Sequence, residues 1–147
     1  MNKKLLGSVV GLFVSKVGME NREAKATLTV ELTGVCEDKF KGKDTLRSVL
    51  LVSFKSYEIA KQNGIDIEIG DLGENILVDF DPYSLESGTR LQVGSTTLEI
   101  SQKSSLCSSL TKINNKLPKL LKDKRGIFAK VIREGFIGEG DSVAQIT

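Results

Sequence analysis

The amino-acid sequence predicts a mainly β protein: a closed or nearly closed β-barrel with one or two short peripheral helices. Many short segments alternate apolar and polar residues or run apolar over a few positions, and glycine or proline separates them. A chain of many short strands leaves the fewest unpaired edges when its sheet closes on itself. With 147 residues, 39% hydrophobic and 27% charged, residues 1–147 are expected to form a single globular domain.

The first half of the chain is expected to open with strands and then form a helix. Residues 5–14 are an apolar run, and residues 26–32 alternate apolar positions with Thr and Glu, as a strand with one buried face does. Residues 48–53 are apolar throughout and are typical of a strand buried on both faces. Residues 57–62 read as a short helix that Gly64 can end in the left-handed conformation.

The second half returns to short strands, interrupted by one helical region. Residues 65–69 alternate isoleucine with carboxylates, which fits a strand or an irregular edge. The helical region has apolar residues at helical spacing up to Leu117, and Pro118 should break or restart the helix. The further predicted strands are residues 76–80, 90–93, 97–100, 126–132 and 141–146.

The N-terminal run follows two lysines, as a secretory signal does, but it is short, contains Gly7 and Gly11, and lacks a convincing cleavage site. A first core strand explains it better. No stretch approaches the length of a membrane span. Cys36 and Cys107 allow one bridge at most, which is no disulfide framework. We therefore expect a cytoplasmic protein with no membrane association and reduced thiols.

The formal net charge of +2 hides an uneven distribution of charge. Residues 65–101 carry eight carboxylates against Arg90 alone, and residues 103–125 carry seven cations against Asp123 alone. This division predicts a local surface that attracts anions rather than a uniformly basic protein.

Several short motifs occur in an order that resembles the MOSC family, named after the C-terminal domain of molybdenum-cofactor sulfurases. The matching pieces are residues 70–76 with Gly-Glu-Asn, 88–94 with Gly-Thr-Arg-Leu, Cys107 followed by Leu110, Arg125-Gly126, and 138–141 ending in Gly-Asp. Gly34, Asp38 and Arg47 extend the resemblance more weakly. The chain departs from the family in having no histidine, Glu37 for a glycine, Phe40 near the usual histidine, and Leu106 for a proline.

The resemblance implies a barrel like the barrel domain of pyruvate kinase and the binding of a molybdenum cofactor of the molybdopterin type. It implies cofactor-binding roles for Arg47, Asn75, Arg90 and Arg125. It also implies that Cys107 carries sulfur or contacts the metal. Some members of the family reduce N-hydroxylated compounds with partner electron donors, so the implied partners are a sulfur donor such as a cysteine desulfurase or an electron-transfer protein.

Cys107 lies where a helix should begin, close to Lys103 in the sequence. A thiol in the first helical turn near cations favours the thiolate, which can accept a sulfur atom or ligate a soft metal. The alternative is an inert, half-buried cysteine, because free cysteine packs well in cores. Cys36 has no motif and is expected to be structural.

Arginine binds phosphate in a bidentate manner, so Arg47, Arg90 and Arg125 are candidates for an anion pocket. The lysines at 39, 41 and 43 are expected to be solvated instead. Residues 73–75 should form a tight turn in which Asn75 bonds backbone groups and Glu74 pairs with an arginine across the barrel.

Two other classes of function stay open: a nucleic-acid binder and a non-catalytic interaction module. The basic stretch 112–125 favours nucleic acid, but low aromatic content and the acidic middle of the chain disfavour it. The lack of histidine argues against a structural zinc site or a Cys-His nucleophile pair.

Overall fold

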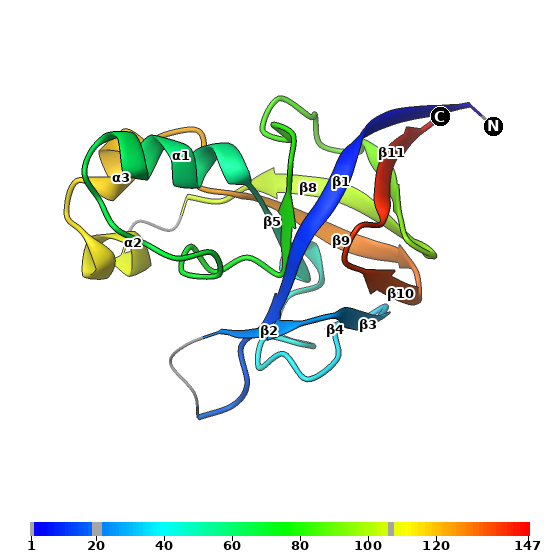
Figure 1. Ribbon diagram of the computed structural model, residues 1–147. Helices are drawn as coiled ribbons and strands as arrows, with labels where there is room; N and C mark the ends of the chain where they lie inside the picture. Colours follow the sequence, from blue (N-terminus) through cyan, green and yellow to red (C-terminus); the bar gives the residue numbers. More distant parts are fainter. Residues whose placement is uncertain (1, 19–21, 106–107) are drawn as a thin grey trace.

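The computed structural model describes residues 2–18, 22–105 and 108–147, and it contains a closed barrel of seven strands (Figure 1). In order around the barrel the strands are β1 (Lys3–Val14), β6 (Ile76–Val78), β5 (Val49–Ser53), β9 (Ile127–Arg133), β8 (Thr96–Lys103), β7 (Arg90–Val93) and β11 (Ser142–Ile146). Strand β1 pairs with both β6 and β11, which closes the sheet, and β2 (Glu23–Lys25) adds to the far end of β1. Among the described strands, β5 and β6 are the pair that runs parallel. The predicted fold class is confirmed.

The N-terminal apolar run is the longest strand and serves two neighbours in turn. Its first half pairs with β11, with Leu5 opposite Ala144, and its second half pairs with β6, with Leu12 opposite Ile76. The register shifts near Gly7 and Gly11, where the long strand changes direction to follow the barrel. The prediction of a core strand at 5–14 is therefore confirmed.

A second, three-stranded sheet is formed by β10 (Gly135–Gly138), β3 (Thr27–Glu31) and β4 (Gly34–Val35), in that order. The alternation predicted for residues 26–32 holds within β3, where Leu28 and Val30 are buried. Together with Ile137 of β10, these side chains join the core inside the barrel. The small sheet thus extends the barrel core rather than forming a domain of its own.

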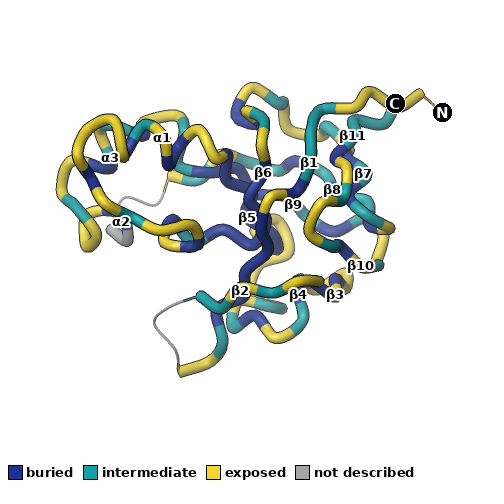
Figure 2. Tube along the Cα trace, in the orientation of Figure 1, coloured by how far each residue is buried: buried dark blue, intermediate teal, exposed yellow. Residues whose placement is uncertain are grey.

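Strand β5 separates two apolar cores, because successive side chains of a strand point to opposite faces. Val49 and Leu51 belong to the core inside the barrel, whereas Leu50 and Val52 belong to a cluster on its outer face. Figure 2 shows the deep burial of this strand between the two. The strand predicted to be buried on both faces is confirmed, and each fully buried Leu or Val contributes roughly 1.5–3 kcal/mol.

Three short helices cover the outer cluster: α1 (Phe54–Gln62), α2 (Ser108–Ile113) and α3 (Leu117–Leu120). Helix α1 begins earlier than predicted, because the Ser53 hydroxyl caps it by accepting from the Lys55 N–H. Gly64 (φ +73°) ends it as expected, and Pro118 lies in the first turn of α3, so the predicted restart is confirmed. Residues 65–69 are irregular rather than a strand. Among the described residues, no helix has the length and apolar character that crossing a membrane requires.

Candidate functional site

Asn75 is the centre of a buried polar cluster between β1, β5 and the loop that precedes β6. Its side-chain oxygen accepts from the Leu50 N–H (3.0 Å), and its amide nitrogen donates to the Phe13 carbonyl (3.2 Å) and to Asp38 Oδ2 (2.7 Å). The prediction that Asn75 bonds backbone groups is confirmed. The same amide ties Asp38 to the barrel wall.

Asp38 and Arg22 form the second part of the cluster. Asp38 is buried, and Arg22 Nη1 lies 3.8 Å from Asp38 Oδ2, which is an ion pair too long for a hydrogen bond. Nη1 is itself buried and has no hydrogen-bond partner among the described residues. Burial lowers the pKa of Arg22, against the attraction of Asp38 and Glu74. The cluster therefore holds a buried guanidinium nitrogen, Arg22 Nη1, that has no hydrogen-bond partner among the described residues.

Glu74, beside Asn75, is fully buried and bonded to a tyrosine rather than to an arginine. The Tyr57 hydroxyl lies 2.7 and 2.6 Å from the two oxygens of Glu74, and the Gly70 N–H donates to one of them (3.1 Å). No cation among the described residues lies within 4 Å of Glu74, so the direct ion pair predicted with an arginine is not formed, and Arg22 attracts the carboxylate only from a longer distance. Because the Tyr57 oxygen also accepts from the Gly70 and Leu72 N–H groups, this pair fixes the loop that presents Asn75.

Burial raises the pKa of Glu74, although the hydrogen bonds that its carboxylate accepts from Tyr57 and Gly70 act in the opposite direction. A carboxyl whose pKa is raised binds its proton more tightly in the folded than in the unfolded state. Its contribution to stability is therefore complete below the ordinary value of 4.5 and declines as the pH rises through the folded-state pKa.

We expect the free energy of unfolding of the wild-type protein to fall as the pH rises above the ordinary glutamate value of 4.5, by at most about 1.4 kcal/mol per pH unit. Glu74→Gln should abolish this decline, because glutamine does not titrate. Other groups do not explain such a decline. Carboxylates with lowered pKa, such as Glu31 and Glu99, reach their full contribution to stability at lower pH, and the chain has no histidine to titrate near neutral pH. Urea unfolding at a series of pH values from about 4.5 upward measures the effect. An equal dependence of the free energy of unfolding on pH in the wild-type and Glu74→Gln proteins would contradict it.

Next to the polar cluster lies an apolar floor made by Leu50 and Phe128, which face each other across β5 and β9. A Cβ atom added to Gly126 would come within 2.8 Å of Leu50 Cδ1, and one added to Gly73 within 3.9 Å of Leu50 Cδ2 and 4.0 Å of Arg22 Nε. Leu50 thus reaches from Gly73 to Gly126. Both glycines have positive φ, of +92° and +144°, so the backbone disfavours larger residues at both positions, and at Gly126 the close approach of Leu50 leaves no space for one either.

Arg47 lies over this floor. It ends the short 3₁₀ helix η1 (Thr45–Arg47), and its guanidinium carbon lies 5.7 Å from the centre of the Phe128 ring. Its Nε is a loose 3.7 Å from Asp44 Oδ2, and its side chain is 45% exposed. With the Gln102 amide in the orientation that satisfies both residues, its side-chain oxygen accepts from Arg47 Nε (3.1 Å) and Nη2 (3.3 Å). The guanidinium is therefore positioned by stacking and by Gln102, while part of the side chain stays exposed to solvent.

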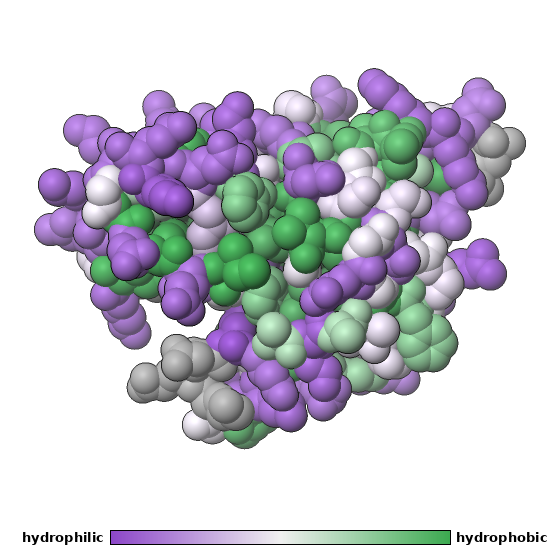
Figure 3. All heavy atoms as spheres, viewed as in Figure 1, coloured by the Kyte–Doolittle hydropathy of each residue, from purple (hydrophilic) through white to green (hydrophobic). Residues whose placement is uncertain are grey.

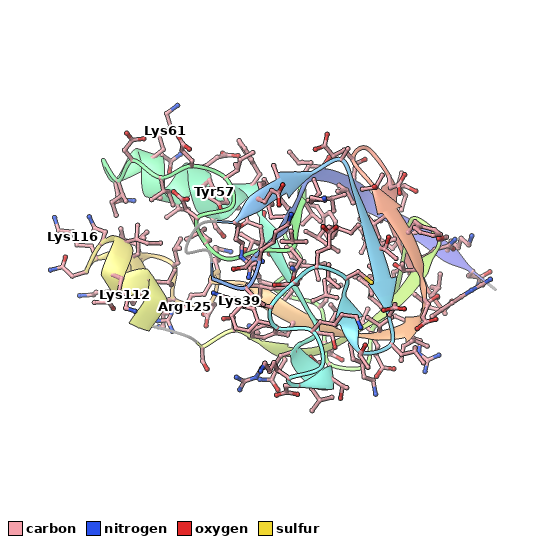
Figure 4. All side chains as sticks on the ribbon, turned by 90° about the horizontal axis from the view of Figure 1, so that it is seen from below. Lys39, Tyr57, Lys61, Lys112, Lys116 and Arg125 are labelled. Atoms are coloured by element: carbon pink, nitrogen blue, oxygen red, sulfur yellow. The ribbon has the colours of Figure 1, made fainter. Side chains whose placement is uncertain are left out.

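Arg125 precedes Gly126 and is anchored by its own guanidinium. Nη2 donates to the Pro118 carbonyl (2.7 Å), as does Nε at 3.3 Å, which ties the start of β9 to helix α3. In the view from below, Lys112, Arg125 and Lys39 follow one another across the face of the molecule (Figure 4).

Arg90 does not join the other predicted site residues. It lies on the exposed side of β7, where its Nε pairs with Glu99 Oε1 at 3.1 Å, and Lys130 pairs with the other oxygen of Glu99. The structure therefore brings Arg47 and Asn75, with Arg125 next to Gly126, to the Leu50–Phe128 floor, and it leaves Arg90 in an ion-pair network on the barrel wall.

Cys107 lies outside the described residues. The chain before it is fixed at Ser104, whose N–H donates to the Gly126 carbonyl (2.9 Å), and the chain after it at Leu110, which is buried in the outer cluster. Cys36 is half-buried and donates to Glu31 Oε1 (3.2 Å), and burial raises its pKa, so it is a poor nucleophile. In the described part of the chain, no group of three His, Cys, Asp or Glu side chains could hold a metal ion.

Sequence reasoning missed Arg22 and Tyr57. Tyr57 carried a usable signal, since a tyrosine three residues before the buried Ala60 faces the core and its hydroxyl needs a partner there. Arg22 carried none: only the folded chain shows that it is packed beside Gly73.

Comparison with known proteins agrees with this architecture. The fold is similar to that of the YuaD protein from Bacillus subtilis, with a TM-score of 0.83 at 20% identity over 99% of both chains. YiiM from Geobacillus stearothermophilus has a TM-score of 0.71 at 16% identity, over 99% of this chain and 76% of that one. YiiM from Escherichia coli has a TM-score of 0.68 at 15% identity, over 95% of this chain and 70% of that one. No curated protein matches the chain.

The sequence model of one family matches most of the chain, from residue 37 to residue 144, under the description MOSC domain. The match contains Asp38, Arg47, Asn75 and Arg125, as well as Cys107. It thereby includes most of the polar cluster and the arginines beside the Leu50–Phe128 floor. The chain belongs to the MOSC domain family.

Proposed function

We propose that this MOSC protein binds a pterin-type molybdenum cofactor over the Leu50–Phe128 floor and that Cys107 carries sulfur to the cofactor or ligates its metal. The observation that carries the proposal is Arg22 Nη1, a buried cationic donor with no hydrogen-bond partner in the described part of the chain. A buried donor left unsatisfied costs about 1–3 kcal/mol, and a ligand oxygen bound there would recover it.

The donor set suits the two ends of such a cofactor. Arg22 and Asp38 offer a donor and an acceptor to a heterocycle whose edge carries both kinds of group. The Leu50 and Phe128 side chains offer an apolar surface for a flat ring, and the partly exposed guanidinium of Arg47 offers its remaining N–H groups to a phosphate. Asn75 orients Asp38 and takes no part in the chemistry. The residues present therefore fit the cofactor.

The cofactor would supply redox chemistry at molybdenum, and the chain would bind and orient it. Cys107 follows a chain segment held to Gly126 and precedes helix α2, with Lys103 and Lys112 close in sequence. Nearby cations favour its thiolate, which is the form that accepts sulfur or ligates a soft metal. We place the protein in the cytoplasm, with a cysteine desulfurase as the sulfur donor.

Retention of the cofactor tests the proposal. The protein is purified from a host that makes the cofactor, the pterin is oxidised to a fluorescent product, and molybdenum is measured by mass spectrometry. Arg47→Gln should lower retention roughly 10-fold or more, since a hydrogen bond to a charged group contributes about 1.5–3 kcal/mol. Arg90→Gln is the matched control and should retain the cofactor fully.

Cys107 is tested separately by intact mass after incubation with a desulfurase and cysteine. The wild-type protein should gain one sulfur atom that dithiothreitol removes, and Cys107→Ser should gain none. A wild-type protein that holds no pterin and gains no sulfur would refute the proposal. Equal loss of pterin in Arg47→Gln and Arg90→Gln would refute the assigned site.

A further inference from the structure

A second concave surface lies away from the Leu50–Phe128 floor, between helix α1 and residues 64–69. This groove has a volume of about 510 Å³ and is lined mainly by apolar side chains, those of Phe54, Tyr57, Ile65, Ile67 and Ile69. Phe54 and Ile69 are 42% and 46% exposed. In Figure 3, apolar side chains are visible among hydrophilic ones on the helical lobe at the left of the view. Exposed apolar surface in a groove indicates an interaction site.

The rim of the groove carries unpaired negative charge. Glu58 and Asp66 line it, and neither forms an ion pair with a described residue. Lys61 is the only cation among the described residues that line the groove, and Glu68 and Asp71 add further exposed carboxylates on the same loop. The groove therefore fits an apolar side chain that is flanked by cations.

The chain itself presents such a feature at the end of helix α2. Ile113 is 40% exposed, with the exposed Lys112 next to it and the exposed Lys116 three residues on. Neither lysine has a carboxylate within 4 Å in the described part of the chain, so both charges are available to a partner. Ile113 with its two lysines is chemically complementary to the groove.

We propose that the groove receives Ile113, Lys112 and Lys116 of a second copy of this chain, in a two-fold symmetric dimer. Groove and helix end belong to one lobe, since residues of α1, α2, α3 and the 65–72 loop share a single apolar cluster. Tyr57 and Lys61 of the groove lie at the same end of the molecule as Lys112 and Lys116 (Figure 4). In a two-fold dimer each contact therefore occurs twice. The net charge of +2 is too small to oppose association.

Charge reversal on each side of the contact gives a test that uses the protein alone. Sedimentation equilibrium of the wild type up to about 500 µM should show the average mass rising toward twice the 16.0 kDa of one chain, and added salt should lower it. Lys112→Glu with Lys116→Glu should weaken association about 10-fold or more, and so should Glu58→Lys with Asp66→Lys. An equimolar mixture of the two variants should associate again, because opposite charges then meet at both contacts.

Lys3→Glu with Lys4→Glu is the matched control: it makes the same change in net charge at the start of β1, and it should leave association unchanged. Circular dichroism melting of each variant checks that it is folded. A wild-type protein that stays monomeric refutes the dimer, and so does a mixture that stays monomeric while the wild type associates. Mass gained only with an added oligonucleotide or an added basic peptide would assign the lysines or the groove to another partner and would also refute it.

Discussion

Asn75→Ala is expected to lower the free energy of unfolding by about 3–5 kcal/mol. Alanine removes three buried hydrogen bonds at once and leaves the Leu50 N–H, the Phe13 carbonyl and the Asp38 carboxylate each without the partner that Asn75 supplies. Among the described residues, Asp38 would keep only the loose ion pair to Arg22 and a long contact of 3.4 Å from the Ser15 N–H. Buried groups that lose their partners cost more than the bonds contribute when they are made.

Denaturant unfolding measures the loss, with Asn115→Ala as the control. Asn115 is exposed and accepts no hydrogen bond in the described part of the chain, so its removal should change stability by less than about 0.5 kcal/mol. An Asn75→Ala protein as stable as this control would mean that water replaces the amide, and the structural role assigned to Asn75 would be wrong.

Tyr57→Phe is expected to cost about 3–5 kcal/mol, although it removes a single oxygen atom. The Tyr57 hydroxyl donates to the buried Glu74 carboxylate, and its oxygen accepts from the Gly70 and Leu72 N–H groups. Burial and the neighbouring Glu74 charge raise the pKa of Tyr57 far above its ordinary value, so the hydroxyl keeps its proton at any working pH. Phenylalanine fills nearly the same space and leaves a buried carboxylate without its main donor.

A double-mutant cycle with Glu74→Gln separates the hydrogen bond from packing. The same Tyr57→Phe change should cost at least about 1 kcal/mol less in the Glu74→Gln protein, because a neutral amide without a partner is less costly than a carboxylate. Equal costs in both backgrounds would show that the ring, rather than the bond to Glu74, determines the effect.

Local spacing in the sequence was sufficient to predict most strands. The period-2 alternation of β3 and the apolar run of β5 reflect which faces of the sheet are covered, and a strand with covered faces needs apolar residues there whatever its partners are. Strand β10 was missed. Glycines at both its ends and an exposed Phe136 hide the pattern, and its stability comes from pairing with β3, with Gly135 opposite Val30. Pairing over so long a separation has no local signature.

The sequence by itself determined three things: the order of its motifs predicted the MOSC family, the many short alternating segments predicted a mainly β barrel, and the turn residues at 73–75 predicted that Asn75 bonds backbone groups. Only the tertiary structure decided which candidates meet. Closure of the barrel leaves Arg90 with Glu99 on the wall and places Arg47 over Phe128, although both arginines stand beside strands in the sequence. Burial likewise selects Tyr57 rather than an arginine for Glu74, and it leaves Arg22 Nη1 without a hydrogen-bond partner among the described residues. A sequence shows which charged groups a chain carries. Their loss of solvent and their hydrogen-bond and ion-pair partners arise only when distant segments pack together, and these determine the pKa and the interactions of each group.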